Sequence, residues 1–180
     1  LSRMGLGTWA IGGGPAWNGD LDLQVCIDTI VEAHRCGINL IDTAPGYNFG
    51  NSEVIVGQAL KKLPRSEVVV ETKCGIVWER TGSLFNKVGD RQLYKNLTPE
   101  SIREEVDASL QRLGIDSIDI YMTHWQSVEP CFTPIAETVD TLNALKKEGK
   151  IRSIGAANVN AGHSREYLKH GELGMMQAKY

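Results

Sequence analysis

Short apolar runs alternate along this chain with longer segments of helical period, and this alternation limits the possible folds more than any other feature. The apolar runs predict strands at Met4–Thr8, Asn39–Thr43, Val68–Thr72, Ile118–Thr123, Ser153–Ala156 and Met175–Ala178. The segments between them predict helices at Leu23–Arg35, Ser52–Leu60, Pro99–Arg112, Ile135–Lys147 and Ala161–Leu168. Units of strand and helix that recur roughly every 30 residues imply a parallel sheet with right-handed crossovers.

Residues at the segment ends agree with these assignments. Thr98 stands where a helix N-cap is expected, with Pro99 in the first turn and acidic residues after it. Gly37, Gly114 and Gly149 stand where helices are expected to stop. The helix boundaries are therefore predicted independently of the apolar pattern.

One connector is unusually long. The stretch from Cys74 to Leu97 has little periodicity, and it includes Trp78, Phe85 and Tyr94. Long connectors in compact domains are either functional or disordered, and aromatic side chains favour a folded structure. We therefore expect a lid or a pocket wall here.

The start of the chain bears on which parallel fold is present. Gly5–Ala10 satisfies the pattern G-x-G-x-x-A of a dinucleotide-binding turn, but Pro15 follows and no helix is expected before about Leu21. A phosphate-binding turn needs a helix N-terminus directly after the glycines, so this match is rejected. An α/β fold of the (β/α) barrel type remains, as a single domain over residues 1–180.

Composition narrows the class of protein. The 180 residues are 42% hydrophobic with a formal net charge of -3, which is ordinary for one globular core. We expect no nucleic acid and no membrane as partner, because the chain is mildly acidic and no apolar run approaches the roughly 18 residues of a membrane span. No signal peptide is apparent.

The four cysteines are scattered along the chain and form no CxxC pair; they are Cys26, Cys36, Cys74 and Cys131. This pattern indicates a reducing, cytoplasmic setting in which most of them are small buried hydrophobes.

Polar residues stand at the ends of the predicted strands. In a parallel barrel the carboxyl ends of the strands form one rim, where catalytic residues gather. The polar residues at or just after these ends are Asp42, Tyr47, Lys73, His124, Asn158 and Gln177. We therefore expect the first four to converge in one cleft.

Asp42, Tyr47, Lys73 and His124 have complementary acid–base properties. A tyrosine has a pKa of about 10, and a buried ammonium group beside it stabilises the phenolate and lowers that pKa. A carboxylate keeps the buried lysine charged, and a histidine can orient a carbonyl oxygen by a hydrogen bond. The set is suited to protonating a carbonyl oxygen during hydride transfer, a reaction that requires a bound cofactor.

Each of these residues also has an ordinary structural explanation. A lysine at a strand end is usually solvated, an Asp–Thr pair often caps a turn, and a histidine after an apolar run is often an interior residue. Four suitable residue types on successive strands favour catalysis over these explanations. A metal site needs three or more close ligands, and only Asp42 and His124 stand at suitable strand ends, so we expect no metal.

Motifs in a fixed order along nearly the whole chain resemble those of the aldo-keto reductases. They are GLGTW (Gly5–Trp9), GINLIDTAPGYNFGNSE (Gly37–Glu53), ETK ending at Lys73, IDIYMTHW ending at Trp125, GKIRSIGAANV (Gly149–Val159) and QAKY (Gln177–Tyr180). The resemblance implies a (β/α)8 TIM barrel, of which this chain would hold about the first six β/α units and would be incomplete at its C-terminal end. It also implies that the barrel reversibly reduces a carbonyl with NADH or NADPH, and it alone suggests NADH. The substrate would be a small aldehyde or ketone, including 2-oxoaldehydes of the methylglyoxal kind.

The resemblance also implies a role for each site residue. Tyr47 would donate the proton and Lys73 would lower its pKa, while Asp42 would pair with Lys73 and His124 would orient the carbonyl. The cofactor would be bound by Gly7, Thr8, Trp9, Asp42, Asn158 and Gln177. The substrate pocket would be lined by Trp9, Trp78 and Trp125.

The chain departs from the family pattern in two ways. Ala157 precedes Asn158 where the family commonly has serine, which removes a hydroxyl contact worth on the order of 1 kcal/mol. A complete barrel of this kind needs about 250 residues, and the segments that grip the pyrophosphate and the adenosine ribose come later. Two other interpretations therefore stay open, namely a nicotinamide-binding regulatory or scaffold subunit with little turnover and an inactive barrel fragment. We expect a monomer or a weak homo-oligomer.

Overall fold

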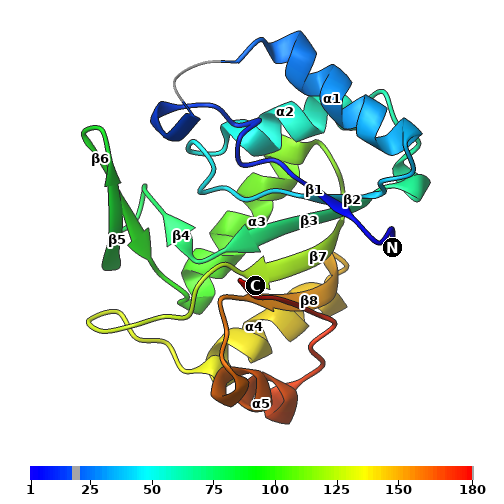
Figure 1. Ribbon diagram of the computed structural model, residues 1–180. Coiled ribbons are helices and arrows are strands. Elements are labelled where there is room, and N and C mark those ends of the chain that lie inside the picture. Colours follow the sequence, from blue (N-terminus) through cyan, green and yellow to red (C-terminus); the bar gives the residue numbers. More distant parts are fainter. Residues whose placement is uncertain (18–20, 180) are drawn as a thin grey trace.

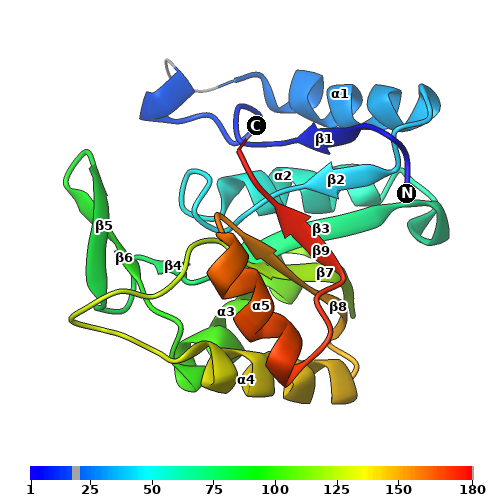
Figure 2. The same cartoon turned by 60° about the horizontal axis from the view of Figure 1, so that its bottom comes forward.

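The computed structural model describes residues 1–17 and 21–179, and within them the predicted strands form one parallel sheet of six strands (Figure 1). The strands are β1 (Gly5–Gly7), β2 (Leu40–Asp42), β3 (Val69–Cys74), β7 (Ile118–Thr123), β8 (Ile151–Ala157) and β9 (Met175–Gln177). They pair in the order β1-β2-β3-β7-β8-β9, so each strand lies beside the next barrel strand of the chain. The sheet curls into an open half-barrel, as Figures 1 and 2 show, which confirms the predicted fold class.

Helices cover the convex face of this sheet (Figure 2). They are α1 (Leu23–Arg35), α2 (Asn51–Leu60), α3 (Pro99–Leu113), α4 (Ile135–Lys147) and α5 (Ala161–His170), with 3-10 turns at Pro15–Trp17 and Arg65–Glu67. The predicted caps are present, since Thr98 accepts a bond from the Ser101 N–H at 3.4 Å and Gly114 ends α3 with a φ of 65°. These bounds lie within two residues of the predicted ones.

The hydrophobic core lies between the sheet and the helices. Ile30, Val56 and Ile102 point into it from α1, α2 and α3 and are almost fully buried. Gly57 allows α2 and α3 to approach closely, because a Cβ at this position would lie 2.6 Å from the carbonyl oxygen of Arg112. The helix layer therefore packs against the outer side of the sheet, and the concave side carries a smaller apolar cluster around Leu40, Ile120 and Met122 together with the polar residues near the strand ends.

The long connector after β3 is folded, as predicted, but its strands were not foreseen. It forms a separate antiparallel sheet of β4 (Ile76–Val77), β5 (Ser83–Val88) and β6 (Arg91–Lys95) in the order β4-β6-β5. The register shifts between Leu84 and Asn86, and most of β5 is exposed. A bulged, solvent-facing strand lacks the apolar alternation by which strands are recognised in a sequence.

The end of the chain completes the described part of the sheet. β9 stops at Gln177, one residue before the predicted end of this strand. Tyr180, the last residue of the QAKY motif, lies outside the described residues. The assignment of residues 1–180 to a single domain stays a prediction.

Candidate active site

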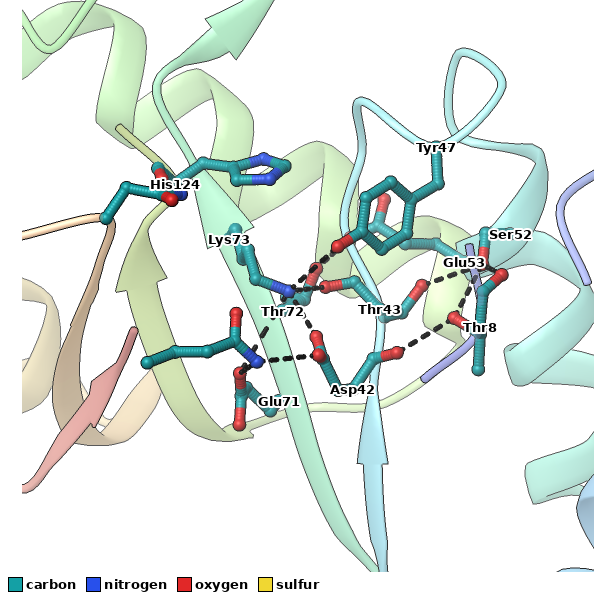
Figure 3. Close-up of polar contacts among 12 residues, drawn as sticks. Thr8, Asp42, Thr43, Tyr47, Ser52, Glu53, Glu71, Thr72, Lys73 and His124 are labelled. Carbon is teal, nitrogen blue, oxygen red and sulfur yellow. Dashed lines mark hydrogen bonds and ion pairs between the residues drawn. The ribbon is translucent and has the colours of Figure 1, made fainter. Parts of the chain in front are cut away.

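Lys73 stands near the end of β3, and its ammonium group is the centre of a buried polar cluster (Figure 3). β2 lies beside β3, so Asp42 reaches the same rim, with Gly7 opposite it on β1. Lys73 Nζ donates to Asp42 Oδ1 in a close ion pair, to the Thr43 carbonyl at 3.0 Å and to the Tyr47 hydroxyl at 3.3 Å. The Lys73 side chain is 0% exposed and that of Asp42 is 18% exposed. The structure therefore brings Asp42, Lys73 and Tyr47 together.

The loop after β2 turns back and carries Tyr47 over this rim. The Tyr47 N–H donates to the Ala44 carbonyl at 3.1 Å, which closes a tight turn. Ser52, at the start of α2, anchors the loop, because its hydroxyl lies 2.7 Å from Thr8 Oγ1 and 3.0 Å from Thr43 Oγ1. Small polar side chains thus connect the loop to the ends of β1 and β2.

Burial and charge act against each other on Lys73 and Tyr47. Burial is the largest single influence on Lys73 and lowers its pKa, but Asp42, Tyr47 and Glu71 together outweigh burial, and the pKa is raised. Burial raises the pKa of Tyr47; Lys73 lowers it, as predicted, but Asp42 and Glu71 oppose Lys73 and the net pKa lies above the ordinary value. Desolvation of the phenolate is the largest influence and was not part of the prediction, which concerned the effect of Lys73 alone. Tyr47 is protonated at neutral pH and can act as a donor.

His124 directly follows β7 and faces Tyr47. Its backbone N–H donates to the Cys74 carbonyl at 2.9 Å, and its ring meets the Tyr47 ring edge-on with centroids 5.7 Å apart. Burial, and secondarily the charge of Lys73, lowers the pKa of His124 to about 3. The imidazole is therefore neutral, and its buried Nδ1 has no hydrogen-bond partner in the described part of the chain. A neutral ring offers one N–H donor and one acceptor nitrogen to a ligand.

Tyr47 and His124 line a cavity of about 410 Å³, a volume typical of small-molecule sites. Trp9, Trp125 and Asn158 line the same cavity. Trp9 also stacks on Tyr47 with centroids 6.2 Å apart. The cavity thus combines aromatic walls with a few convergent polar groups.

Trp78 does not reach this cavity. It lines a separate depression that shares Ile76 with the cavity, and its ring meets Phe49 edge-on at 5.6 Å. The wall that the prediction assigned to Trp78 comes instead from the hairpin of β5 and β6 and consists of Phe85, Asn86, Val88 and Leu93. Only the aromatic content of the connector hinted at these residues.

The remaining predicted cofactor residues are tied to the polar cluster. Thr8 is fully buried, and its hydroxyl donates to the Asp42 carbonyl at 3.0 Å. Gln177 Nε2 donates to Asp42 Oδ2 at 2.8 Å, across the interior of the half-barrel. Asn158 Nδ2 donates to the His124 carbonyl at 2.8 Å. Both amides therefore use their nitrogens in contacts within the protein.

The burial of the cysteines agrees only partly with the prediction that most of them are buried. Cys26 and Cys74 are buried, Cys131 is half-buried and Cys36 is exposed, and all of them are free thiols. Burial raises the pKa of Cys74 well above its ordinary value, so its thiol stays protonated and unreactive. Over residues 1–17 and 21–179, no helix combines the length and the apolar character needed to cross a bilayer.

Known proteins resemble this chain in sequence over its whole extent. The family model of the Aldo/keto reductase family matches residues 3–179. The NADH-specific methylglyoxal reductase of Escherichia coli strain K12 is 87% identical over 180 residues, which make up 100% of this chain and 55% of that protein.

Solved structures show the same likeness. A glycerol dehydrogenase from Gluconobacter oxydans has a TM-score of 0.83 at 37% identity, covering 99% of this chain and 51% of that one. An aldo-keto reductase from Klebsiella pneumoniae in complex with NADPH has a TM-score of 0.76 at 27% identity, covering 100% of this chain and 55% of that one. The chain thus spans about half the length of the relatives that it matches.

Proposed function

This chain belongs to the aldo/keto reductase family, and on that premise we propose that the complete protein reduces small aldehydes or ketones to alcohols with a nicotinamide cofactor. One observation carries the proposal: the buried Lys73 contacts both Asp42 and Tyr47 at the edge of a cavity that His124 also lines. A protein that only binds a nicotinamide has no need of this proton-delivering set.

The residues around the cavity fit a nicotinamide ring and its carboxamide. Trp9, Tyr47 and Trp125 offer aromatic surfaces to a planar ring. Asn158 and Gln177 use their amide nitrogens within the protein, so their amide oxygens are the atoms that would accept from a carboxamide. A bound reduced nicotinamide supplies the hydride that the carbonyl carbon of the substrate accepts.

The chain itself supplies the proton. The neutral imidazole of His124 holds the carbonyl oxygen by its N–H. As the carbonyl carbon gains the hydride, the π electron pair moves to the oxygen, and the Tyr47 hydroxyl transfers its proton there. Lys73 stabilises the resulting phenolate, Asp42 keeps Lys73 charged, and Tyr47 regains a proton from water.

The relatives supply the finer part of the proposal. The Escherichia coli protein is named an NADH-specific methylglyoxal reductase, whereas the Klebsiella pneumoniae structure holds NADPH. At 87% identity to the former, we assign NADH and small 2-oxoaldehydes to this protein. The free thiols fit a reducing, cytoplasmic location, and the monomer or weak homo-oligomer also belongs to the proposal.

Replacing Tyr47 with Phe tests the proposal most directly. In the complete protein, Tyr47→Phe is expected to lower the rate of methylglyoxal reduction about 10²–10⁴-fold, the range for a lost general acid. NADH affinity, measured by quenching of tryptophan fluorescence, is expected to stay close to that of the wild type. Tyr94→Phe is the matched control, because Tyr94 lies on β6 outside the cavity lining. Near wild-type turnover by Tyr47→Phe would refute the proposed mechanism.

A further inference from the structure

Glu71 is a second buried acid beside the catalytic lysine. It precedes Lys73 by two residues on β3, so the alternation of the strand turns both side chains into the half-barrel. Glu71 is 0% exposed, and its Oε1 lies 4.0 Å from Lys73 Nζ. The parallel register places it opposite Asp42. In Figure 3 the Lys73 ammonium lies between the Tyr47 hydroxyl and the two carboxyl groups.

The Glu71 carboxyl group is incompletely hydrogen-bonded. Its Oε2 is buried and has no partner in the described residues, and its Oε1 has only a 3.4 Å contact from Gln177 Nε2. The shorter bond of Gln177, at 2.8 Å, goes to Asp42. Burial, supported by the charge of Asp42 and opposed by Lys73, raises the pKa of Glu71 to about 7. Glu71 therefore changes charge near neutral pH.

The neighbourhood of Glu71 contains few other charges. The titratable groups that face it are Asp42 on β2, Lys73 on β3 and Tyr47 in the loop after β2. β7 presents Ile120 as the register partner of Glu71, and β9 presents the neutral amide of Gln177. β1 consists of glycine and leucine alone. The charge of Glu71 thus acts on the same lysine and tyrosine that deliver the proton.

We infer that Glu71 is a positioning residue for proton delivery, whose carboxyl group competes with Tyr47 for the positive charge of Lys73. While Glu71 is neutral, Asp42 alone balances Lys73, which can stabilise the Tyr47 phenolate. Once Glu71 is ionised, its negative charge raises the pKa of Tyr47 and makes it a weaker acid. The inference rests on the proposed function and adds a pH control to it.

Single-turnover rates of carbonyl reduction by the complete protein test this inference, since they report the chemical step apart from product release. Between about pH 6 and about pH 8.5, the wild-type rate is expected to fall about three- to tenfold, because a weaker acid transfers its proton more slowly. Glu71→Gln is expected to vary less than about twofold and to exceed the wild type at the upper end. The matched control is Glu105→Gln, which removes a half-buried acid of α3 that faces the outer side of the sheet, and its profile is expected to follow that of the wild type.

Identical pH profiles for the wild type and Glu71→Gln would overturn the inference and leave the proposed function standing, because both proteins would still reduce the carbonyl. A second readout does not depend on activity. Titration of the Tyr47 phenol by ultraviolet absorbance, with Tyr47→Phe as the reference, is expected to give a lower pKa in Glu71→Gln than in the wild type. An equal or higher pKa would overturn the inference, whereas a wild type that reduces no carbonyl would refute the proposed function itself.

Discussion

The ionisable groups that lie on the two sides of β3 differ in how fully they are paired. On the outer face, both oxygens of Glu53 are occupied: Thr72 Oγ1 donates to one and Arg112 Nε to the other, each at 2.6 Å. On the inner face, one oxygen of Glu71 and Nδ1 of His124 are buried without a partner among residues 1–17 and 21–179. The two clusters share consecutive residues of β3, since Thr72 stands between Glu71 and Lys73.

Glu105 extends the contrast. Its two oxygens accept from the Gly75 N–H at 2.8 Å and from the Ser101 hydroxyl at 3.0 Å, so the outer acids are fully bonded. Buried polar groups normally find partners, and a group without one is costly unless it serves a purpose. The full bonding of Glu53 and Glu105 therefore indicates a structural role for these two acids, and the incomplete bonding of Glu71 and His124 leaves atoms for substrate and proton.

The largest loss of activity is expected when the positive charge at the centre of the inner face is removed. Lys73→Met is expected to lower the single-turnover rate of carbonyl reduction about 10²–10⁴-fold, because the Tyr47 phenolate loses its stabilising charge. The rate of NADH oxidation with methylglyoxal measures this effect. A rate within about tenfold of the wild type would show that the inner cluster is not the proton-delivering set.

The matching change on the outer face is Arg112→Met, which leaves the fully buried Glu53 without its cation. The free energy of unfolding is expected to fall by about 3 kcal/mol, the lower end of the cost of breaking a buried ion pair. Urea denaturation measures this loss, and the reduction rate per folded molecule is expected to stay unchanged. A large loss of rate in the folded variant would contradict the separation of the two faces.

A smaller effect is expected from Thr72→Val, which keeps the shape of the side chain and removes the hydroxyl that donates to Glu53. The loss of this hydrogen bond to a charged group is expected to cost about 1.5 kcal/mol of unfolding free energy. Thr72 lies between Glu71 and Lys73 in the chain. If the pH profile of reduction is unchanged in Thr72→Val, the two faces of the strand act independently. A shifted profile would mean that strain passes through the strand.

The last effect is a dependence of stability on pH and is expected from Glu105→Gln. Burial raises the pKa of Glu105 to about 8 from its ordinary value of 4.5, so the folded protein retains a proton that the unfolded chain releases. The contribution of Glu105 to stability is therefore fully present below its ordinary pKa and is lost as the pH rises toward about 8. Thermal midpoints measured across this range are expected to decline less steeply in Glu105→Gln. Equally steep declines in the wild type and in Glu105→Gln would show that Glu105 does not cause this pH dependence.

The sequence allowed most of the sheet and its helices to be predicted, because two independent signals coincide there. α1 and α4 have the predicted bounds, set by apolar periodicity and by residues that end helices. The hairpin of β5 and β6 could not be predicted, since β5 faces solvent and its register is shifted at Leu84. Its strands depend on pairing with each other and with β4 rather than on burial.

The site was predictable to the extent that its residues stand at strand ends. Asp42, Tyr47, Lys73 and His124 do so, and the structure brings them together. Glu71 was missed because it lies inside the strand, although its spacing of two from Lys73 was a usable signal for a shared face. Trp78 was misplaced because the path of the connector was unknown.

The register that sets Glu71 opposite Asp42 also restricts the order in which descendants of this sequence can change. Replacing Lys73 first would leave two enclosed acids side by side with no cation, whereas replacing Glu71 first leaves an intact ion pair. An evolutionary path that avoids a poorly folded intermediate therefore passes through position 71 before position 73. In lineages that abandon carbonyl reduction, we expect the acid at position 71 to disappear before the lysine at position 73.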